Sequence, residues 1–119
     1  MGLDMYAYAA AKEDSEWNDG NHRELTYWRK HPNLHGWMEE LYRAKGGNVE
    51  MFNGVELELT WEDLEVLERD ILLGNLPNTR GFFFGDNSDE YYREQDLKFI
   101  REARAEIFTG LRVFYNSSW

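Results

Sequence analysis

The chain contains nineteen aromatic side chains and no cysteine, so large apolar groups are available to a core that disulfides cannot brace. Five tryptophans, seven tyrosines and seven phenylalanines are spread over 119 residues. Each of these side chains can bury about 150–250 Å². A chain of this length can therefore form one hydrophobic core without disulfides or metal ions, and intrinsic disorder is excluded because disordered chains are poor in aromatic residues. We expect a single globular domain over residues 1–119.

The absence of cysteine also limits chemistry and location. Neither a thiol nucleophile nor a thiolate metal site can form, and a small domain without disulfides favours a reducing compartment. No apolar run approaches the roughly 20 residues of a membrane helix. The first ten residues lack the basic start and apolar centre of a signal peptide. The sequence therefore predicts a soluble cytoplasmic protein with no membrane partner.

The formal net charge of −10 restricts the choice of partner. Proteins that bind duplex DNA present a basic face, and this chain has only 13 lysines and arginines against 23 acidic residues. Duplex nucleic acid is therefore not an expected partner. The acidity keeps an aromatic-rich domain in solution, and it also suits docking to a basic surface.

Period-two alternation of apolar and polar residues predicts a strand over residues 3–10. The polar segment 12–23 contains Asp19-Gly20, a turn signal, and predicts an exposed loop. Residues 24–28 predict a second short strand that pairs with the first. Together these segments predict an N-terminal pair of strands.

A helix is predicted from Pro32, which suits a first helical position, to the glycine pair at residues 46–47. Asn53-Gly54 is a strong signal for a two-residue hairpin turn. A strand is expected over residues 55–59, but the residues before the turn would mix faces if they paired with it. The partner of this strand is therefore left open.

The second half predicts two further helices. Thr60 is a good N-cap, and Asp63 three residues later completes a box-like arrangement for a helix that ends near Leu73. The other predicted elements are a loop over 76–80, a short aromatic strand over 81–85, a turn over 86–90, a helix over 94–109 and a strand over 111–115. The pattern predicts an α+β fold, in which one mixed or antiparallel sheet of about four to five short strands packs with three amphipathic helices.

Two histidines and a glutamate share a spacing that could hold a metal ion. His31, His35 and Glu39 follow each other at intervals of four residues, so one helix face could present two imidazoles and a carboxylate to an ion such as zinc. Pro32 occupies the position at which a zinc peptidase carries its catalytic glutamate, so that motif fails. The alternative is a capping His31 and a half-buried His35 beside Trp37.

The most basic segment of this acidic chain is flanked by aromatic residues. Arginine and lysine can hold a phosphate, and tyrosine or tryptophan can stack on a base. The alternative is that Trp28 lies in the core and the cations face acidic neighbours. The candidate anion-binding residues are Tyr27, Trp28, Arg29, Lys30, His31 and Arg80.

Other motifs fail on inspection. The segment 86–90 resembles the start of a calcium loop, but Tyr91 and Leu97 occupy the positions that require glycine and glutamate. The carboxylates at Glu56 and Glu58 share a strand face and indicate a solvated or docking surface more than an acid–base pair. There is no glycine-rich phosphate loop and no nucleophile elbow. We assign no catalytic residue, and the sequence identifies no cofactor.

Several stretches together resemble a family of small uncharacterised proteins of bacteriophages and prophages. They are the opening Met1 to Tyr6, Tyr-Trp-Arg-Lys-His at 27–31, His-Gly-Trp at 35–37, the 55–60 stretch, Gly-Phe-Phe-Phe-Gly at 81–85, Tyr91-Tyr92 and the Phe114-Tyr115 and Trp119 ending. The similarity covers nearly the whole chain except residues 12–23. It implies a phage-encoded protein in the cytoplasm of an infected bacterium, and it carries no activity.

Three hypotheses follow. The first is a non-enzymatic accessory protein that binds a host bacterial protein through the acidic helix around Glu62 to Asp70. The second is a binder that sequesters a nucleotide or another small anionic ligand at the basic segment. The third is a metal-dependent hydrolase that uses the two histidines and Glu39. A symmetric homodimer is compatible with base rates alone.

Overall fold

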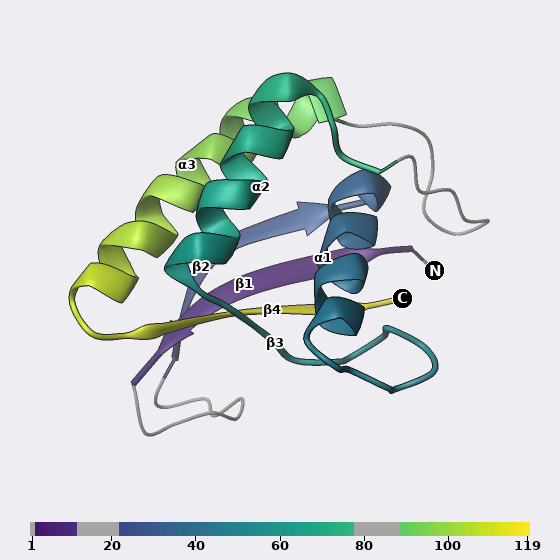
Figure 1. Ribbon diagram of the computed structural model, residues 1–119, viewed down its shortest axis with the longest axis horizontal. Coiled ribbons are helices and arrows are strands. Elements are labelled where there is room, and N and C mark those ends of the chain that lie inside the picture. Colours follow the sequence, from purple (N-terminus) through teal and green to yellow (C-terminus); the bar gives the residue numbers. More distant parts are fainter. Residues whose placement is uncertain (1, 12–21, 78–88) are drawn as a thin grey trace.

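The computed structural model describes residues 2–11, 22–77 and 89–119. Within these ranges a four-stranded antiparallel sheet carries three helices on one face (Figure 1). The elements are β1 Asp4–Ala10, β2 His22–Arg29, α1 Pro32–Ala44, β3 Leu57–Leu59, α2 Trp61–Leu73, α3 Asp89–Phe108 and β4 Arg112–Ser118. The predicted α+β class is confirmed. The strand predicted over 81–85 lies outside the described residues, as does most of the loop predicted over 12–23.

The sheet has the order β2-β1-β4-β3, so the first and last strands of the described chain lie at its centre. They pair along their full length, from Asp4 opposite Ser118 to Ala10 opposite Arg112. This pairing explains why β1 is buried over most of its residues, since a neighbouring strand flanks it on each side. It also explains why β4 extends three residues beyond the predicted end at Tyr115.

The two faces of the sheet follow from the alternation of side chains. Met5 and Ala7 of β1 and Val113 of β4 face the helices and belong to the main core. Tyr6 and Tyr8 point to the opposite face, where Tyr8 packs against Phe114 in a second, smaller buried cluster. The pairing of β1 with β2 shifts by one residue between Ala7 and Tyr8. Ala7 lies opposite Thr26, and Tyr8 lies opposite Glu24.

Aromatic side chains are the largest groups in the interior, as expected of a chain rich in them. The largest fully buried side chains include Trp28, Tyr8, Tyr115, Phe52 and Phe99. They come from strands, from a loop and from α3, so the core joins elements that are distant in sequence. Aromatic rings in edge or offset contact add stability beyond the area that they bury.

Side chains from neighbouring helices cover both edges of the sheet. On β2, the Gln95 amide donates to the Tyr27 carbonyl at 2.7 Å, and the Tyr92 hydroxyl contacts the backbone of Arg29 on both its N–H and its C=O. On β3, Lys45 Nζ donates to the Glu58 carbonyl at 2.7 Å. Unpaired backbone groups on edge strands invite pairing with other chains, and these contacts satisfy some of them.

Helix α2 follows its sequence signals closely. Thr60 and Asp63 form the reciprocal capping box, and Gly74 ends the helix in the left-handed conformation with φ 70°. The buried stripe of the helix consists of Leu64, Leu67 and Ile71. None of the helices in the described ranges is both long and apolar enough to cross a membrane.

Several predicted boundaries are wrong. Helix α3 begins at Asp89 instead of Glu94, so the last two residues of the predicted turn are helical. Arg23, predicted in a loop, belongs to β2 and pairs with Ala9. Phe108, the last residue of α3, is 84% exposed.

The Asn53-Gly54 turn does not make a hairpin. No strand precedes it in residues 45–52, and the following strand begins at Leu57 instead of Val55. The turn instead docks on the end of β4, where Gly54 N–H donates to the Ser117 carbonyl at 2.7 Å. The Asn53 amide and the Trp119 backbone exchange two hydrogen bonds at 2.7 and 2.9 Å. A non-local contact therefore replaces the local pairing that the turn signal suggests.

Replacing Thr60 by alanine tests the cap of α2. The variant loses the acceptor for the Asp63 N–H, and we expect the free energy of unfolding to fall by about 1 kcal/mol. Urea denaturation followed by circular dichroism would show a lower midpoint with an unchanged slope. The control is Thr109→Ala, which removes a hydroxyl that donates to the Glu106 carbonyl just after the end of α3. This variant should lower the free energy of unfolding by less than about 0.5 kcal/mol. Equal losses in the two variants would contradict the capping role.

Candidate functional site

The predicted basic segment crosses from β2 into α1, and its side chains point in different directions. Tyr27 is 41% exposed and lies on the open face of the sheet, whereas Trp28 is fully buried in the core. Arg29 and Lys30 are exposed, and His31 is fully buried. Lys30 adopts a positive φ of 58°, which turns the chain from the strand into the helix. The five residues therefore do not line one pocket, and Arg80 lies outside the described residues.

Asp96 joins Trp28 and His31 in a buried network that the sequence analysis missed. Its Oδ1 accepts the Trp28 indole N–H at 2.8 Å, and its Oδ2 lies 2.9 Å from His31 Nε2. The side chains of His31 and Asp96 are 0% and 1% exposed. The His31 ring also stacks on Tyr92, with 4.8 Å between ring centroids. The carboxylate thus connects β2, the start of α1 and α3.

His35, one turn further along α1 than His31, belongs to a second buried network. Its Nδ1 shares a 2.6 Å hydrogen bond with the Tyr115 hydroxyl, and its ring packs against Phe52. Burial lowers the pKa of His35 to about 4, although a hydrogen bond to the Phe52 backbone acts in the opposite direction. Burial also raises the pKa of Tyr115 well above its usual value. Both groups are therefore neutral near pH 7.

The three predicted metal ligands do not come together. His31 and His35 belong to the separate networks just described, and the Glu39 carboxylate lies 3.4 Å from the Arg43 guanidinium on the same helix. The described ranges contain no group of three or more histidines, aspartates and glutamates placed to hold a metal ion. His31 acts as the N-cap residue of α1, with no hydrogen bond from its side chain to the helix start.

The paired glutamates before α2 have separate partners. Glu58 accepts two hydrogen bonds from Arg112, at 2.9 and 2.7 Å, and this contact lowers the pKa of its carboxyl. Glu56 accepts a hydrogen bond from the Tyr8 hydroxyl, and burial together with this contact raises the pKa of Tyr8. An acid–base pair needs one carboxyl with a raised pKa, and the contact with Arg112 shifts the pKa of Glu58 in the opposite direction.

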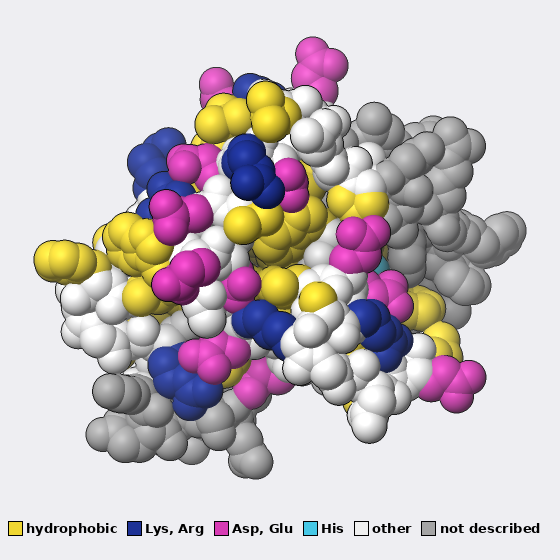
Figure 2. Space-filling view, in the orientation of Figure 1, with side chains coloured by type: hydrophobic (Ala, Val, Ile, Leu, Met, Phe, Trp, Pro, Cys, Tyr) yellow, Lys and Arg dark blue, Asp and Glu magenta, His cyan; other side chains and the backbone are white. Residues whose placement is uncertain are grey.

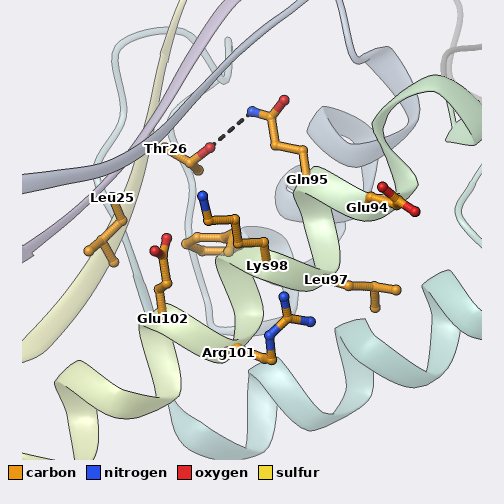
Figure 3. Close-up of a pocket in the computed structure, with 9 residues that line it drawn as sticks. Leu25, Thr26, Glu94, Gln95, Leu97, Lys98, Arg101 and Glu102 are labelled. Carbon is orange, nitrogen blue, oxygen red and sulfur yellow. Dashed lines mark hydrogen bonds between the residues drawn. The ribbon is translucent and has the colours of Figure 1, made fainter.

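A cavity of about 770 Å³ lies between β2 and α3 (Figure 3). Leu25 and Thr26 form its strand side, and Gln95 bridges it with a 2.9 Å hydrogen bond to Thr26 Oγ1. Lys98 and Glu102 point from α3 toward the strand. These groups provide hydrogen bonds and opposite charges but no pair of nucleophile and base. We therefore do not assign chemistry to this cavity.

The outer face of α2 exposes apolar and acidic side chains together. Val66, Leu72 and Leu73 are 39%, 51% and 64% exposed. Glu62 and Glu65 are exposed on the same helix. Figure 2 shows acidic, basic and hydrophobic side chains interspersed over the helical side of the molecule.

Comparisons of the chain with protein-family models, with curated proteins and with solved structures found no match. The fold and the contacts described above therefore define the class of protein as an α+β domain with aromatic and hydrogen-bonded cores.

The buried His35 predicts a loss of stability in mild acid. An unfolded histidine titrates near pH 6.5 and the folded one near 4, so between these values only the unfolded chain binds the proton. Stability present above pH 6.5 is therefore lost as the pH falls, by about 3 kcal/mol over the whole window. Urea midpoints measured from pH 7 to 5 would show the decline. The variant His35→Gln should flatten it, and an unchanged slope in that variant would contradict the assignment.

Removing the Asp96 carboxylate should strongly destabilise the fold. Asp96→Ala leaves the Trp28 indole N–H and a ring nitrogen of His31 without this partner, at an expected cost of about 3–5 kcal/mol. Asp96→Asn keeps an acceptor and should cost less. The control is Asp4→Ala, which removes the exposed acceptor of the Tyr27 hydroxyl and should cost less than about 1 kcal/mol. Chemical denaturation measures all three, and similar losses for Asp96→Ala and Asp4→Ala would refute the role of the network.

Proposed function

We propose that the protein is a non-enzymatic binding protein that docks a basic surface of another protein on the outer face of α2. The observation that carries this proposal is the exposure of Val66, Leu72 and Leu73 beside Glu62 and Glu65. An interface combines apolar and polar contacts, and this surface offers both. Val66 and Leu73 lie one turn to either side of the exposed Arg69, and the two glutamates lie toward the start of the helix. The acidic side chains select for a partner of positive charge.

The flanks of α2 are fixed to the rest of the molecule, which leaves its outer face as a rigid surface. Asp70 accepts the Trp37 indole N–H at 2.8 Å, and Asp63 contacts Lys45. On the other flank, Glu68 accepts from Arg104 at 3.0 Å. Because these contacts hold the helix in place, binding on its outer face would not have to pay the entropy of ordering it.

Long-range electrostatics favour the same kind of partner. The net charge of −10 creates a negative field around the whole molecule. Such a field accelerates association with a basic partner, and the effect weakens as salt is added. We therefore expect the protein to associate with a basic partner faster at low ionic strength.

We extend the proposal to a biological setting. The motifs that resemble phage and prophage proteins support a phage-encoded accessory protein, and its partner would then be a host bacterial protein met in the cytoplasm. The binding of a nucleotide at the basic segment has less support, because Trp28 and His31 are buried and committed to Asp96. A metal-dependent hydrolase has less support because both candidate histidines lie in buried networks.

A photoreactive residue on α2 tests the proposed surface. We expect p-benzoylphenylalanine at position Val66 to form covalent adducts with a basic protein in bacterial lysate on irradiation. The matched control carries the same residue at Glu40, an exposed position on α1, and should form far fewer adducts. Mass spectrometry identifies the adducts.

Charge reversal on the same face completes this test. Adding Glu62→Lys and Glu65→Lys to the Val66 probe should reduce the adducts at least fivefold, because the partner is basic. The same result is expected at about 0.5 M salt, at which exposed charges are screened. Equal labelling from positions 66 and 40, or labelling that is insensitive to both charge and salt, would refute the proposal.

A further inference from the structure

The face of the sheet that points away from the helices carries aromatic side chains in pairs. Tyr6 of β1 lies against Tyr27 of β2, with 5.3 Å between ring centroids. Tyr8 stacks on Phe114 of β4 at 5.5 Å. The Arg112 guanidinium lies over the Phe114 ring at 5.1 Å. This face therefore already contains one contact between an arginine and an aromatic ring. In Figure 1 the face is turned away from the viewer, because the helices lie in front of the sheet.

A groove of about 370 Å³ crosses this face. It is lined by Tyr6, Glu24, Gly54, Asn116, Ser117 and Ser118. Tyr6 pairs with Asn116 across β1 and β4, and Gly54 is hydrogen bonded to Ser117 at the next position across the sheet. The groove therefore spans about three interstrand spacings from β2, or roughly 14 Å. An extended peptide covers that distance with about four residues.

The groove is electrostatically negative at one end. The neighbouring acidic side chains are mostly engaged: Asp4 accepts from the Tyr27 hydroxyl at 2.6 Å, and Glu58 binds Arg112. Glu24 is exposed and has no ion pair or hydrogen bond within the described part of the chain. Burial raises the pKa of Tyr6, and the negative charges of Asp4 and Glu24 raise it further. The Tyr6 ring thus lies in the field of two carboxylates.

We propose that this groove binds an arginine side chain presented by an extended segment of another protein. The guanidinium would stack on the Tyr6 ring and pair with the Glu24 carboxylate. A planar guanidinium combines stacking on an aromatic face with hydrogen bonding in its plane, which a lysine ammonium cannot do. The length of the groove favours a peptide over a free cationic metabolite, which would occupy only the end at Glu24.

This site is independent of the surface on α2. The two lie on opposite sides of the sheet, since α2 packs on the helical face and the groove lies on the other. The protein could therefore hold two basic segments at once. A failure at one site leaves the evidence for the other unchanged.

The test is a titration of the full-length protein, labelled with ¹⁵N, with the peptide acetyl-Gly-Ser-Arg-Ser-Gly-amide at low ionic strength. We expect amide shifts centred on Tyr6, Glu24 and Asn116. The same peptide with citrulline, which has the shape of arginine but no charge, should cause none. Glu24→Gln should weaken binding about five- to tenfold. Glu40→Gln, which makes the same charge change at an exposed position on α1, is the matched control and should leave binding unchanged.

Three results would overturn the inference. They are the absence of localised shifts with the arginine peptide, equal weakening by Glu24→Gln and Glu40→Gln, and acetyl-arginine-amide alone binding as tightly as the pentapeptide. The last result would replace the peptide by a small cationic ligand. Tyr6→Leu provides a second variant, whose amide spectrum reports whether it folds. A folded Tyr6→Leu protein with unweakened binding would exclude the proposed stacking.

Discussion

The fold depends on one buried carboxylate. Asp96 of α3 holds the indole of Trp28 at the end of β2 and the imidazole of His31 at the start of α1, so a single side chain fixes where a strand ends and a helix begins. All three groups are almost completely removed from solvent. A carboxylate in such a place is costly unless it is paired, and it then strongly favours the one arrangement that pairs it. With α1 and α3 fixed against β2, α2 is held between the flanking partners Trp37 and Arg104.

This arrangement places the residues with conspicuous chemistry, Trp28, His31 and His35, in buried hydrogen-bonded networks, and we propose that recognition takes place on the outside. The histidines that suggest a metal site stabilise two separate interiors, one around Asp96 and one around Tyr115. The surfaces on both sides of the sheet are instead acidic and partly aromatic or apolar. An acidic molecule with two such surfaces is suited to contact basic proteins, and it needs no bound cofactor to do so.

Local signals in the sequence predict the local structure well. The capping box at Thr60, the stripe of Leu64, Leu67 and Ile71, and the alternation in β1 each depend on neighbours within a few residues. The networks could not be predicted in this way, because Asp96 and Tyr115 are 65 and 80 residues from their histidine partners. One clue was present: Asp96 interrupts the apolar face of α3 between Tyr92 and Ile100, where a solvated carboxylate would not be expected. The hairpin predicted from Asn53-Gly54 is wrong because contacts with the end of β4, which is distant in sequence, outweigh the local preference for a hairpin.

The central claim is that the histidines and tryptophans are structural and that the protein functions by binding other proteins. Native mass spectrometry of the protein, purified gently from bacterial cells without a chelator, tests this most directly. The account predicts the mass of the bare chain, alone or in complex with another polypeptide. A metal ion or a small molecule retained at one equivalent per chain, and lost in a folded His35→Ala variant, would contradict it.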